Sequence, residues 1–334
     1  MLFQNICGVD LGTDTIKIRD KSGKKFMDSK NMIAVRNETE VIAIGDAAYE
    51  MYEKNPVNVE VSCPMINGVI ASAANMELVL SHTLKKFTSF AQTSSDICMA
   101  VPSNVTPVEQ RAFFNVLSGS INASKIRLVD KGIADAVSIG LPVLSPTGHM
   151  IVNVGADTTE ISVVANGNVI LGQTLKTGGK KLDADICTMI RRKFNINIGM
   201  KTAERLKNNL AFMINGPRLE QKVFGIHTLS GLPKSDMIPS LAVSVAIIDT
   251  IDSMVENIKS VYGRTPPQIM TDIANEGIFL TGGVSMLLNL PIYMQKEIGL
   301  PIYHIQDPKN STVRGLVEII NNKELRGLTR APRL

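Results

Sequence analysis

Two short loops, one in each half of the chain, share a pattern of polar residues around a small residue. The first opens at Asp10 and the second at Asn153, and each follows an apolar run typical of a strand. Small residues let backbone N–H groups approach phosphate oxygens closely, and threonine hydroxyls add hydrogen-bond donors. One such loop alone suits an ordinary hairpin turn. The matching pair, at equivalent positions of two halves, predicts a polyphosphate site.

The two loops differ at their first position, where the second has an amide in place of an acid. A carboxylate such as Asp10 can orient water around Mg²⁺, an ion that keeps several of its own waters in proteins. Asp10 is therefore the residue expected to hold a metal ion, through water. The loop residues expected to contact the phosphates are Asp10, Gly12, Thr13, Asp14, Thr15, Asn153, Gly155, Ala156, Asp157 and Thr158.

A pair of glycines, Gly282 and Gly283, follows an apolar strand predicted at residues 278–281. Such a turn lets the backbone approach a flat base or a ribose, and a helix predicted after it would direct N–H groups toward an anion. The chain has no Gly-x-x-x-x-Gly-Lys-Ser/Thr sequence, which excludes a P-loop nucleotide site.

Strands and helices alternate around these motifs, which argues for an α/β fold. Each loop is expected to join two strands of a hairpin, and a Pro-rich stretch at residues 141–148 separates the two halves. Thr106 is expected to cap a helix that opens at Pro107. The other strands are expected at residues 6–10, 16–19, 97–101, 126–129, 150–153 and 161–165. Residues 21–31 are a variable stretch in which no strand is expected. The other helices are expected near residues 76–87, 134–139, 181–194, 201–214 and 241–261.

Length and composition suit a soluble two-domain protein. The 334 residues are 44% hydrophobic and 20% charged, with a net charge of +4. This mild basic excess lacks the dense Lys/Arg cluster of a nucleic-acid reader, so we expect no nucleic-acid partner. The four widely spaced cysteines predict neither a zinc site nor a disulfide framework. There is no secretory signal and no stretch of about 20 apolar residues, and a cytoplasmic location is expected.

Together, the paired loops and the Gly-Gly turn resemble the motifs of the actin, sugar kinase and heat-shock chaperone superfamily. Within it, the chain is similar over nearly its whole length to the bacterial actins of the MreB/Mbl family. Matching segments occur in one order along the chain. They lie at residues 43–48, 67–71, 101–111, 140–143, 146–148, 177–179, 197–199, 202–204 and 299–302.

The resemblance implies an α/β, actin-like ATPase fold. Two similar α/β domains, each with a mixed five-stranded sheet flanked by helices, would enclose a nucleotide cleft. Domain I would span residues 1–145 with a small insert at about 32–66. Domain II would span residues 146–320 with an insert at about 180–246, and residues 321–334 would return to domain I.

The resemblance also assigns residues to the nucleoside. Glu204, Arg205 and Lys207 fall where the family grips ribose and adenine. From residue types alone, Glu204 and Lys207 would be a solvated ion pair one helical turn apart. The adenosine turn would comprise Gly282, Gly283, Val284 and Ser285.

Four positions depart from the family pattern. Asn153 replaces an acid, and Lys131, after Asp130, stands where the family has a glutamate that positions the attacking water. Lys17, which is expected among the nucleotide-binding residues, replaces an apolar residue. Asp157 replaces a glycine whose left-handed backbone an aspartate can tolerate. The net change in local charge is about +3, taking unit charges at neutral pH. A lysine is no general base at neutral pH unless its pKa is strongly lowered.

These departures predict a divergent MreB-like actin that binds ATP or ADP, holds Mg²⁺ weakly and hydrolyses ATP poorly or not at all. It would form filaments that organise cell shape and cell-wall synthesis. One alternative is an active ATP-hydrolysing filament protein, in which Asp130 takes over the water. Two further alternatives are less favoured. One is a monomeric actin-fold kinase. The other is a plasmid-segregating or division-type actin relative, whose pattern the spacing of Lys17 after Asp10 resembles.

The family resemblance implies partners as well. Protofilaments would pair, in antiparallel double filaments, beneath the cytoplasmic membrane, near the cell-wall elongation machinery. Candidates for insertion into lipid are Leu2, Phe3, Phe87 and Phe90, because apolar residues beside Lys85 and Lys86 suit an interface. Packing of Phe87 in the core is an equal alternative.

Overall fold

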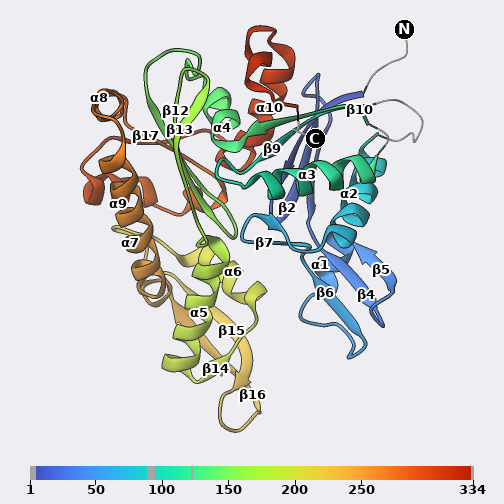
Figure 1. Cartoon of the computed structure of the whole chain (residues 1–334). Helices are drawn as coiled ribbons and strands as arrows, with labels where there is room; N and C mark the ends of the chain where they lie inside the picture. The colour runs from blue at the N-terminus through green and yellow to red at the C-terminus, as the bar shows by residue number, and fades with distance from the viewer. Residues whose placement is uncertain (1–4, 89–94, 122, 332–334) are drawn as a thin grey trace.

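The computed structural model describes residues 5–88, 95–121 and 123–331 (Figure 1). Its two central sheets each have five strands. The first has the order β10-β9-β1-β2-β3, with β1 (Asn5–Leu11), β2 (Thr15–Asp20), β3 (Phe26–Lys30), β9 (Ser95–Val101) and β10 (Ala123–Asp130). The second has the order β13-β12-β11-β17-β18, with β11 (His149–Val154), β12 (Thr159–Ala165), β13 (Asn168–Leu175), β17 (Ile278–Thr281) and β18 (Ile302–His304).

The two sheets repeat one topology. In the first, β1, β2 and β3 run antiparallel in succession, while β9 pairs parallel with both β1 and β10. In the second, β11, β12 and β13 do the same, and β17 pairs parallel with both β11 and β18. The repeat seen in the two loops is therefore a repeat of whole sheets, and the predicted pair of mixed five-stranded sheets is confirmed.

Two helices lie between the sheets, α4 (Lys131–Ile139) and α10 (Ser311–Asn321) (Figure 1). Helix α4 follows β10 of the first sheet but packs against β11 and β12 of the second, and α10 packs against β1, β2 and β9 of the first. The two helices cross closely, because a Cβ atom on Gly315 would lie 1.8 Å from the carbonyl oxygen of Ala134. The two helices therefore form a layer that connects one sheet to the other.

Other helices cover the outer faces. Beside the first sheet lie α2 (Ala73–Thr88) and α3 (Pro107–Ser120), the latter opened by the expected capping box of Thr106 and Glu109. In the second half, α7 (Ser240–Arg264), α8 (Pro267–Glu276) and α9 (Leu290–Ile298) pack against strands of the five-stranded sheet. Helices α5 (Gly179–Phe194) and α6 (Met200–Leu210) instead pack against strands of one of the small units described next, and belong to that unit. Short 3₁₀ turns are η1 (Gly283–Met286), η2 (Pro308–Asn310) and η3 (Glu324–Leu328).

Two small units extend from the sheets and overlap the segments expected to be inserts, except that β8 follows the expected end of the first insert. One contains β4 (Ile33–Arg36), β5 (Glu40–Ile44), α1 (Asp46–Met51), β6 (Val59–Ser62), β7 (Met65–Ile66) and β8 (Val69–Ile70). The other contains β14 (Ile196–Asn197), β15 (Glu220–His227) and β16 (Pro233–Pro239). Near the end of the chain, Arg330 forms an antiparallel bridge with Leu128 of β10. The exact domain boundaries stay a prediction.

Some local expectations were wrong. The stretch described only as variable, with no strand expected in it, contains β3, whose residues are mostly polar and at most partly buried. Helix α6 ends at Leu210, four residues before its expected end at Ile214. Phe87 is 4% exposed and packs in the core of the first half, so it is not available to a lipid surface. Leu2, Phe3 and Phe90 lie outside the described residues. Within the described ranges, no helix is long and apolar enough to cross a bilayer.

Candidate functional site

The two predicted phosphate loops have the same local geometry. The backbone N–H of Gly12 donates to the carbonyl oxygen of Thr15 at 3.0 Å, and that of Gly155 donates to Thr158 at 2.9 Å. A Cβ atom on Gly12 would lie 2.7 Å from the Thr15 oxygen, so this turn requires glycine. Each loop connects the first two strands of its sheet. The repeat in sequence thus corresponds to a repeat in backbone structure.

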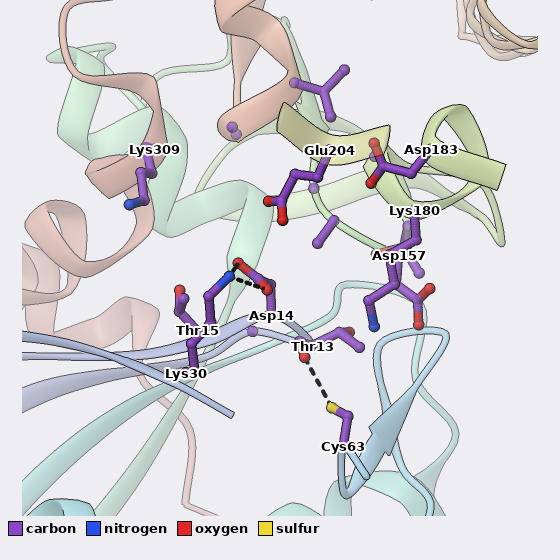
Figure 2. A pocket seen from close by; sticks show the side chains of 18 of the residues that line it. Thr13, Asp14, Thr15, Lys30, Cys63, Asp157, Lys180, Asp183, Glu204 and Lys309 are labelled. Carbon is purple, nitrogen blue, oxygen red and sulfur yellow. Dashed lines mark hydrogen bonds and ion pairs between the residues drawn. The ribbon is translucent and has the colours of Figure 1, made fainter. Parts of the chain in front are cut away.

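A cavity of about 1060 Å³ opens between the two halves and is lined by both loops (Figure 2). Most of the predicted site residues face it. These are Asp10, Gly12, Thr13, Asp14, Thr15, Lys17, Lys131, Asn153, Gly155, Ala156, Asp157, Thr158, Glu204, Lys207, Gly282, Gly283 and Val284.

Three predicted residues are not among those that line the cavity. The Asp130 carboxylate accepts hydrogen bonds from both terminal nitrogens of Arg330, at 2.7 and 2.5 Å. This bidentate pair engages the Asp130 carboxylate with the end of the chain, which argues against the alternative that Asp130 takes over the water. Arg205 is exposed on the outer side of α6. Ser285 is buried and donates to the carbonyl oxygen of Gly282 at 2.7 Å.

Lys131, the first residue of α4, directs its ammonium group toward the first loop. Its Nζ lies 3.7 Å from Oδ1 of Asp10, and both side chains are largely buried. Burial acts to lower the pKa of Lys131, but the carboxylates of Asp10, Glu160 and Asp135 together raise it. The lysine is therefore held as a cation next to the acid expected to hold a metal.

Asn153, the departure in the second loop, is a hydrogen-bond donor. Its Nδ2 donates to Oδ2 of Asp135 at 2.6 Å, and the Asp135 side chain is 0% exposed. Hydroxyls from β17 and α10 complete the surroundings of this carboxylate: Thr281 at 2.9 Å, Ser311 at 2.8 Å and Thr312 at 2.7 Å. Burial raises the pKa of Asp135, although Lys131, Asn153, Thr312 and Ser311 lower it.

Sequence reasoning also missed Glu160, which lines the cavity from β12. Its Oε2 accepts from the backbone N–H of Ser103 at 2.8 Å, and the residue is 5% exposed. Burial raises its pKa, whereas Lys131 lowers it. Lys131 is thus surrounded by three carboxylates, of which only Asp10 had been expected from the loop pattern.

Lys207 does not form the solvated pair with Glu204 that residue types alone suggest. It is 8% exposed, its Nζ lies 2.8 Å from Asp183 Oδ1, and it also donates to the carbonyl oxygen of Gly179 at 3.1 Å. Burial raises the pKa of Asp183 to about 6, even though Lys207 lowers it. A buried, anchored lysine in the cavity wall fits a ligand-binding role better than a surface ion pair.

Contacts from the two small units close the mouth of the cavity. Glu204 accepts from the Tyr49 hydroxyl at 3.1 Å. Lys201 donates to the backbone oxygen of Tyr49, and its Nζ lies 4.2 Å from the centre of that ring. Glu53 accepts from the backbone N–H of Met200. Residues more than 140 positions apart in the sequence therefore meet over the cleft.

Asp157 also connects the two halves of the molecule. Its Oδ2 accepts from the backbone N–H of Asn67 at 2.7 Å, so it bridges the second loop to the first half. Its backbone is not among the residues with positive φ, so the expected left-handed conformation is not adopted. At the adenosine turn, Gly282 does have φ +83, and a Cβ atom there would lie 2.4 Å from the Val154 oxygen. A Cβ atom on Gly283 would meet open space, as a surface against a flat ligand requires.

Further polar contacts brace the first loop (Figure 2). Lys30 donates to both carboxylate oxygens of Asp14, at 2.8 and 3.0 Å. The Cys63 thiol donates to the carbonyl oxygen of Thr13 at 2.9 Å, and burial raises the pKa of this thiol. Over the described part of the chain, no group of three or more His, Cys, Asp or Glu side chains is placed to hold a metal ion.

Comparison with known proteins places this geometry in a family. The family model described as MreB/Mbl protein matches residues 4–326. The cell shape-determining protein Mbl of Bacillus subtilis (strain 168) is 29% identical over 328 residues, covering 97% of this chain and 98% of Mbl. The cell shape-determining protein MreB of Escherichia coli (strain K12) is 30% identical over 322 residues, covering 94% and 92%.

Solved structures agree. MreB5 of Spiroplasma citri bound to ADP superimposes with a TM-score of 0.90 at 26% identity, over 97% of this chain and 98% of MreB5. Its form bound to AMPPNP gives a TM-score of 0.88 at the same identity, over 97% of each chain. The MamK double helical filament, at 18% identity and a TM-score of 0.78 over 96% of this chain and 99% of MamK, has the same fold. The chain is therefore actin-like in fold, and it belongs to the MreB/Mbl protein family.

Proposed function

We propose that this chain is a nucleotide-binding, filament-forming bacterial actin with weak or absent ATP hydrolysis. The observation that carries the proposal is the ion pair of Lys131 with Asp10, 3.7 Å apart, in a cavity lined by two equivalent phosphate loops. The geometry retains the parts that bind a nucleotide. It alters the part that would activate water.

Binding of ATP or ADP is supported by the cavity and by related structures. The backbone N–H groups and hydroxyls of the two loops would receive the phosphates, while Glu204, Lys207 and the Gly282–Gly283 turn would hold the nucleoside. The MreB5 structures, at 26% identity, are bound to ADP and to AMPPNP. A cavity of about 1060 Å³ is large enough for such a ligand, since ligand sites commonly enclose about 300–1,000 Å³.

Weak hydrolysis follows from the charges near the first loop. A residue that orients attacking water must accept a proton or a hydrogen bond from it, and a lysine ammonium is donor-only. The pKa of Lys131 is raised by its carboxylate neighbours, so it is even less able to act as a base. We do not expect Asp130 to replace it, because Arg330 holds that carboxylate.

The hold on Mg²⁺ is expected to be weakened for the same reason. Asp10 would have to share its negative charge between the metal and Lys131, and Asn153 is neutral and already donates to Asp135. Mg²⁺ is commonly bound through one or two carboxylates plus substrate phosphates. Here the phosphates would carry most of that coordination.

Membership of a family of cell shape-determining proteins supports a cytoskeletal role. We propose that the chain assembles into filaments, in antiparallel pairs, in the cytoplasm at the inner face of the membrane. There it would act with the cell-wall elongation machinery to organise cell shape, as a divergent paralogue of a main shape protein.

The test is phosphate release by the wild type, Lys131→Glu and the double variant Lys131→Glu/Asn153→Asp. The wild type should release phosphate near the buffer background, and the double variant at least about tenfold faster, since a positioned acid or base contributes about 10²–10⁴-fold. The Asn153→Asp change also places a carboxylate beside buried Asp135. The single variant Lys131→Glu therefore shows the effect of position 131 without that added repulsion. Lys131→Met, which removes the cation without adding an acid, is the matched control and should stay slow.

ATP binding by Lys131→Glu should also become more dependent on Mg²⁺, because Asp10, Glu160 and Asp135 would then neighbour a fourth acid. Wild-type turnover as fast as that of the double variant, and abolished by chelating Mg²⁺, would instead support the active ATPase alternative. Electron microscopy with and without ATP separates a filament former from a monomeric actin-fold kinase.

A further inference from the structure

Seven lysines line the cavity, and five of them already have a partner in the described part of the chain. Lys30 pairs with Asp14, Lys131 with Asp10, Lys207 with Asp183 and Lys309 with Asp28, while Lys201 donates to a backbone oxygen. The remaining two are Lys17 and Lys180. Within the described residues, neither of these ammonium groups has a hydrogen bond or an ion pair.

Lys180 is held in place by its backbone. It is the second residue of α5, and its N–H donates to the carbonyl oxygen of Ala156 at 2.7 Å. The preceding Gly179 donates to Gly155 at 3.0 Å. The first turn of α5 is thus hydrogen-bonded directly to the second phosphate loop. Any ligand in that loop lies within the reach of the Lys180 side chain.

The side chain is directed into the cavity. Figure 2 shows Lys180 beside Asp157, on the side of the cavity that faces Thr13 and Cys63 of the first half. It is close enough to Cys63 to influence the thiol electrostatically, and it is partly buried. The next residue, Lys181, is exposed and pairs with Asp185 one turn along the same helix. Two adjacent lysines therefore have different surroundings, one in the cavity and one in solvent.

Lys17 approaches from the opposite half. It lies on β2, directly after the first phosphate loop, and is 8% exposed. Its cross-strand neighbour Asp28 attracts it, but that carboxylate is already paired with Lys309. A buried ammonium group is costly unless an anion completes its surroundings. Lys17 and Lys180 thus present to the same cavity two ammonium groups that make no hydrogen bond or ion pair within the described residues, one from each half.

We propose that Lys180 is a phosphate ligand that, with Lys17 on the other side, clamps the polyphosphate of the bound nucleotide between the two halves. This proposal deepens the nucleotide-binding function above and rests on it. The N-terminus of α5 adds a favourable field for an anion. The clamp supplies positive charge from the protein itself. It does so at a site where Asp10, the acid expected to hold a metal ion, already pairs with Lys131.

The clamp predicts that the effect of Lys180 grows with the number of phosphates. Lys180→Ala should weaken ATP binding about tenfold, ADP binding less, and AMP binding less than about twofold, because a charge-assisted hydrogen bond is worth roughly 1.5–3 kcal/mol and 1.4 kcal/mol is tenfold. Lys180→Arg should retain most of the ATP affinity. Lys181→Ala, which removes the adjacent solvent-facing lysine, is the matched control and should bind like the wild type.

Affinities for AMP, ADP and ATP would be measured by calorimetry, with excess Mg²⁺ and again with a chelator. Circular dichroism and the unfolding midpoint establish that each variant is folded. Unchanged ATP affinity in Lys180→Ala, or an equal loss for AMP and ATP, would overturn the clamp while leaving nucleotide binding intact. A wild-type chain that binds none of the three nucleotides would overturn the proposed function, and the clamp with it.

Discussion

Lys131 is the cation around which the acids of the cavity are arranged. Its position and that of Asn153 could be predicted, because both stand at fixed places in recognisable motifs. Asp135 and Glu160 could not, because no motif marked them and a lone acid in an Ala-rich helix suggests a solvated face. One signal was present: Asp135 lies four residues after Lys131, which places the two on the same side of α4. An expected charge excess near the loops is therefore partly balanced by two buried carboxylates.

His149 gives a prediction about stability at the residue level. It begins β11, is 1% exposed, and neither ring nitrogen has a hydrogen-bond partner in the described structure. Burial lowers its pKa, although the carboxylates of Glu276 and Asp272 act to raise it. The unfolded chain, with a His pKa of about 6.5, therefore binds a proton at a higher pH than the folded chain does. Folding stability should fall as the pH falls below about 6.5.

Urea unfolding at pH 7.5 and pH 5.5 measures this effect. The wild type should lose more stability between the two values than His149→Leu, in which the titrating group is absent. His82→Gln, at an exposed position on α2, should keep the wild-type loss. An equal loss in all three proteins would show that His149 does not take up the proton.

At the level of elements, the predicted strands and helices were those with strong apolar periodicity. The hairpins at the two loops, the capped helix α3 and the long helix α7 all have it. Strand β3 does not, because its polar residues lie at the edge of a sheet and are only partly buried. Strands β15 and β16 were not predicted either, because their exposed positions carry apolar side chains and so remove the usual alternation.

Those exposed side chains on the β15–β16 hairpin lead to a prediction about assembly. Phe224 is 70% exposed, Ile226 54%, Leu229 89% and Leu232 64%. Figure 1 shows the hairpin at one end of the molecule, away from both five-stranded sheets. Contiguous exposed apolar surface marks interaction sites. For a member of the MreB/Mbl family that we propose to form filaments, the expected occupant is a second copy of the chain.

Phe224→Ser/Leu229→Ser should raise the concentration needed for sedimentable filaments at least about tenfold, since losing a central apolar contact commonly costs about 2 kcal/mol or more. ATP affinity should not change, because neither residue lines the cavity. Leu144→Ser, which alters an exposed leucine in the link between the halves, is the control. Filaments that form at the wild-type concentration would exclude the hairpin from the contact.

For the whole molecule, the resemblance to the MreB/Mbl family correctly implied two similar domains, each with a mixed five-stranded sheet. The degree of closure of the cavity between the halves could not be predicted. Tyr49 and Glu204 are separated by 155 positions, and no local pattern pairs a tyrosine of one small unit with a helix of the other. Asp157 shows the same limit: its charge was noticed, but its contact with the backbone of Asn67 depends on how the halves meet.

This closure predicts how nucleotide leaves. Tyr49 covers the cavity mouth by donating to Glu204 at 3.1 Å, while Lys30 and Lys201 lie 4.3 and 4.2 Å from its ring centre. Tyr49→Phe keeps the ring and both cation–π contacts but removes the hydroxyl. Because a hydrogen bond to a charged group is worth roughly 1.5 kcal/mol or more, nucleotide release should accelerate about tenfold with little change in the association rate.

Stopped-flow displacement of a fluorescent ATP analogue by excess unlabelled ATP measures the release rate directly. Tyr52→Phe is the matched control, because Tyr52 also lines the cavity, 6.4 Å from the ring of Tyr49, but its hydroxyl has no hydrogen-bond partner in the described chain. It should release nucleotide at the wild-type rate. Equal rates for Tyr49→Phe and the wild type would mean that the small units do not retain the ligand. Slower association in Tyr49→Phe would instead place the tyrosine in ligand capture, because closure after binding affects dissociation alone.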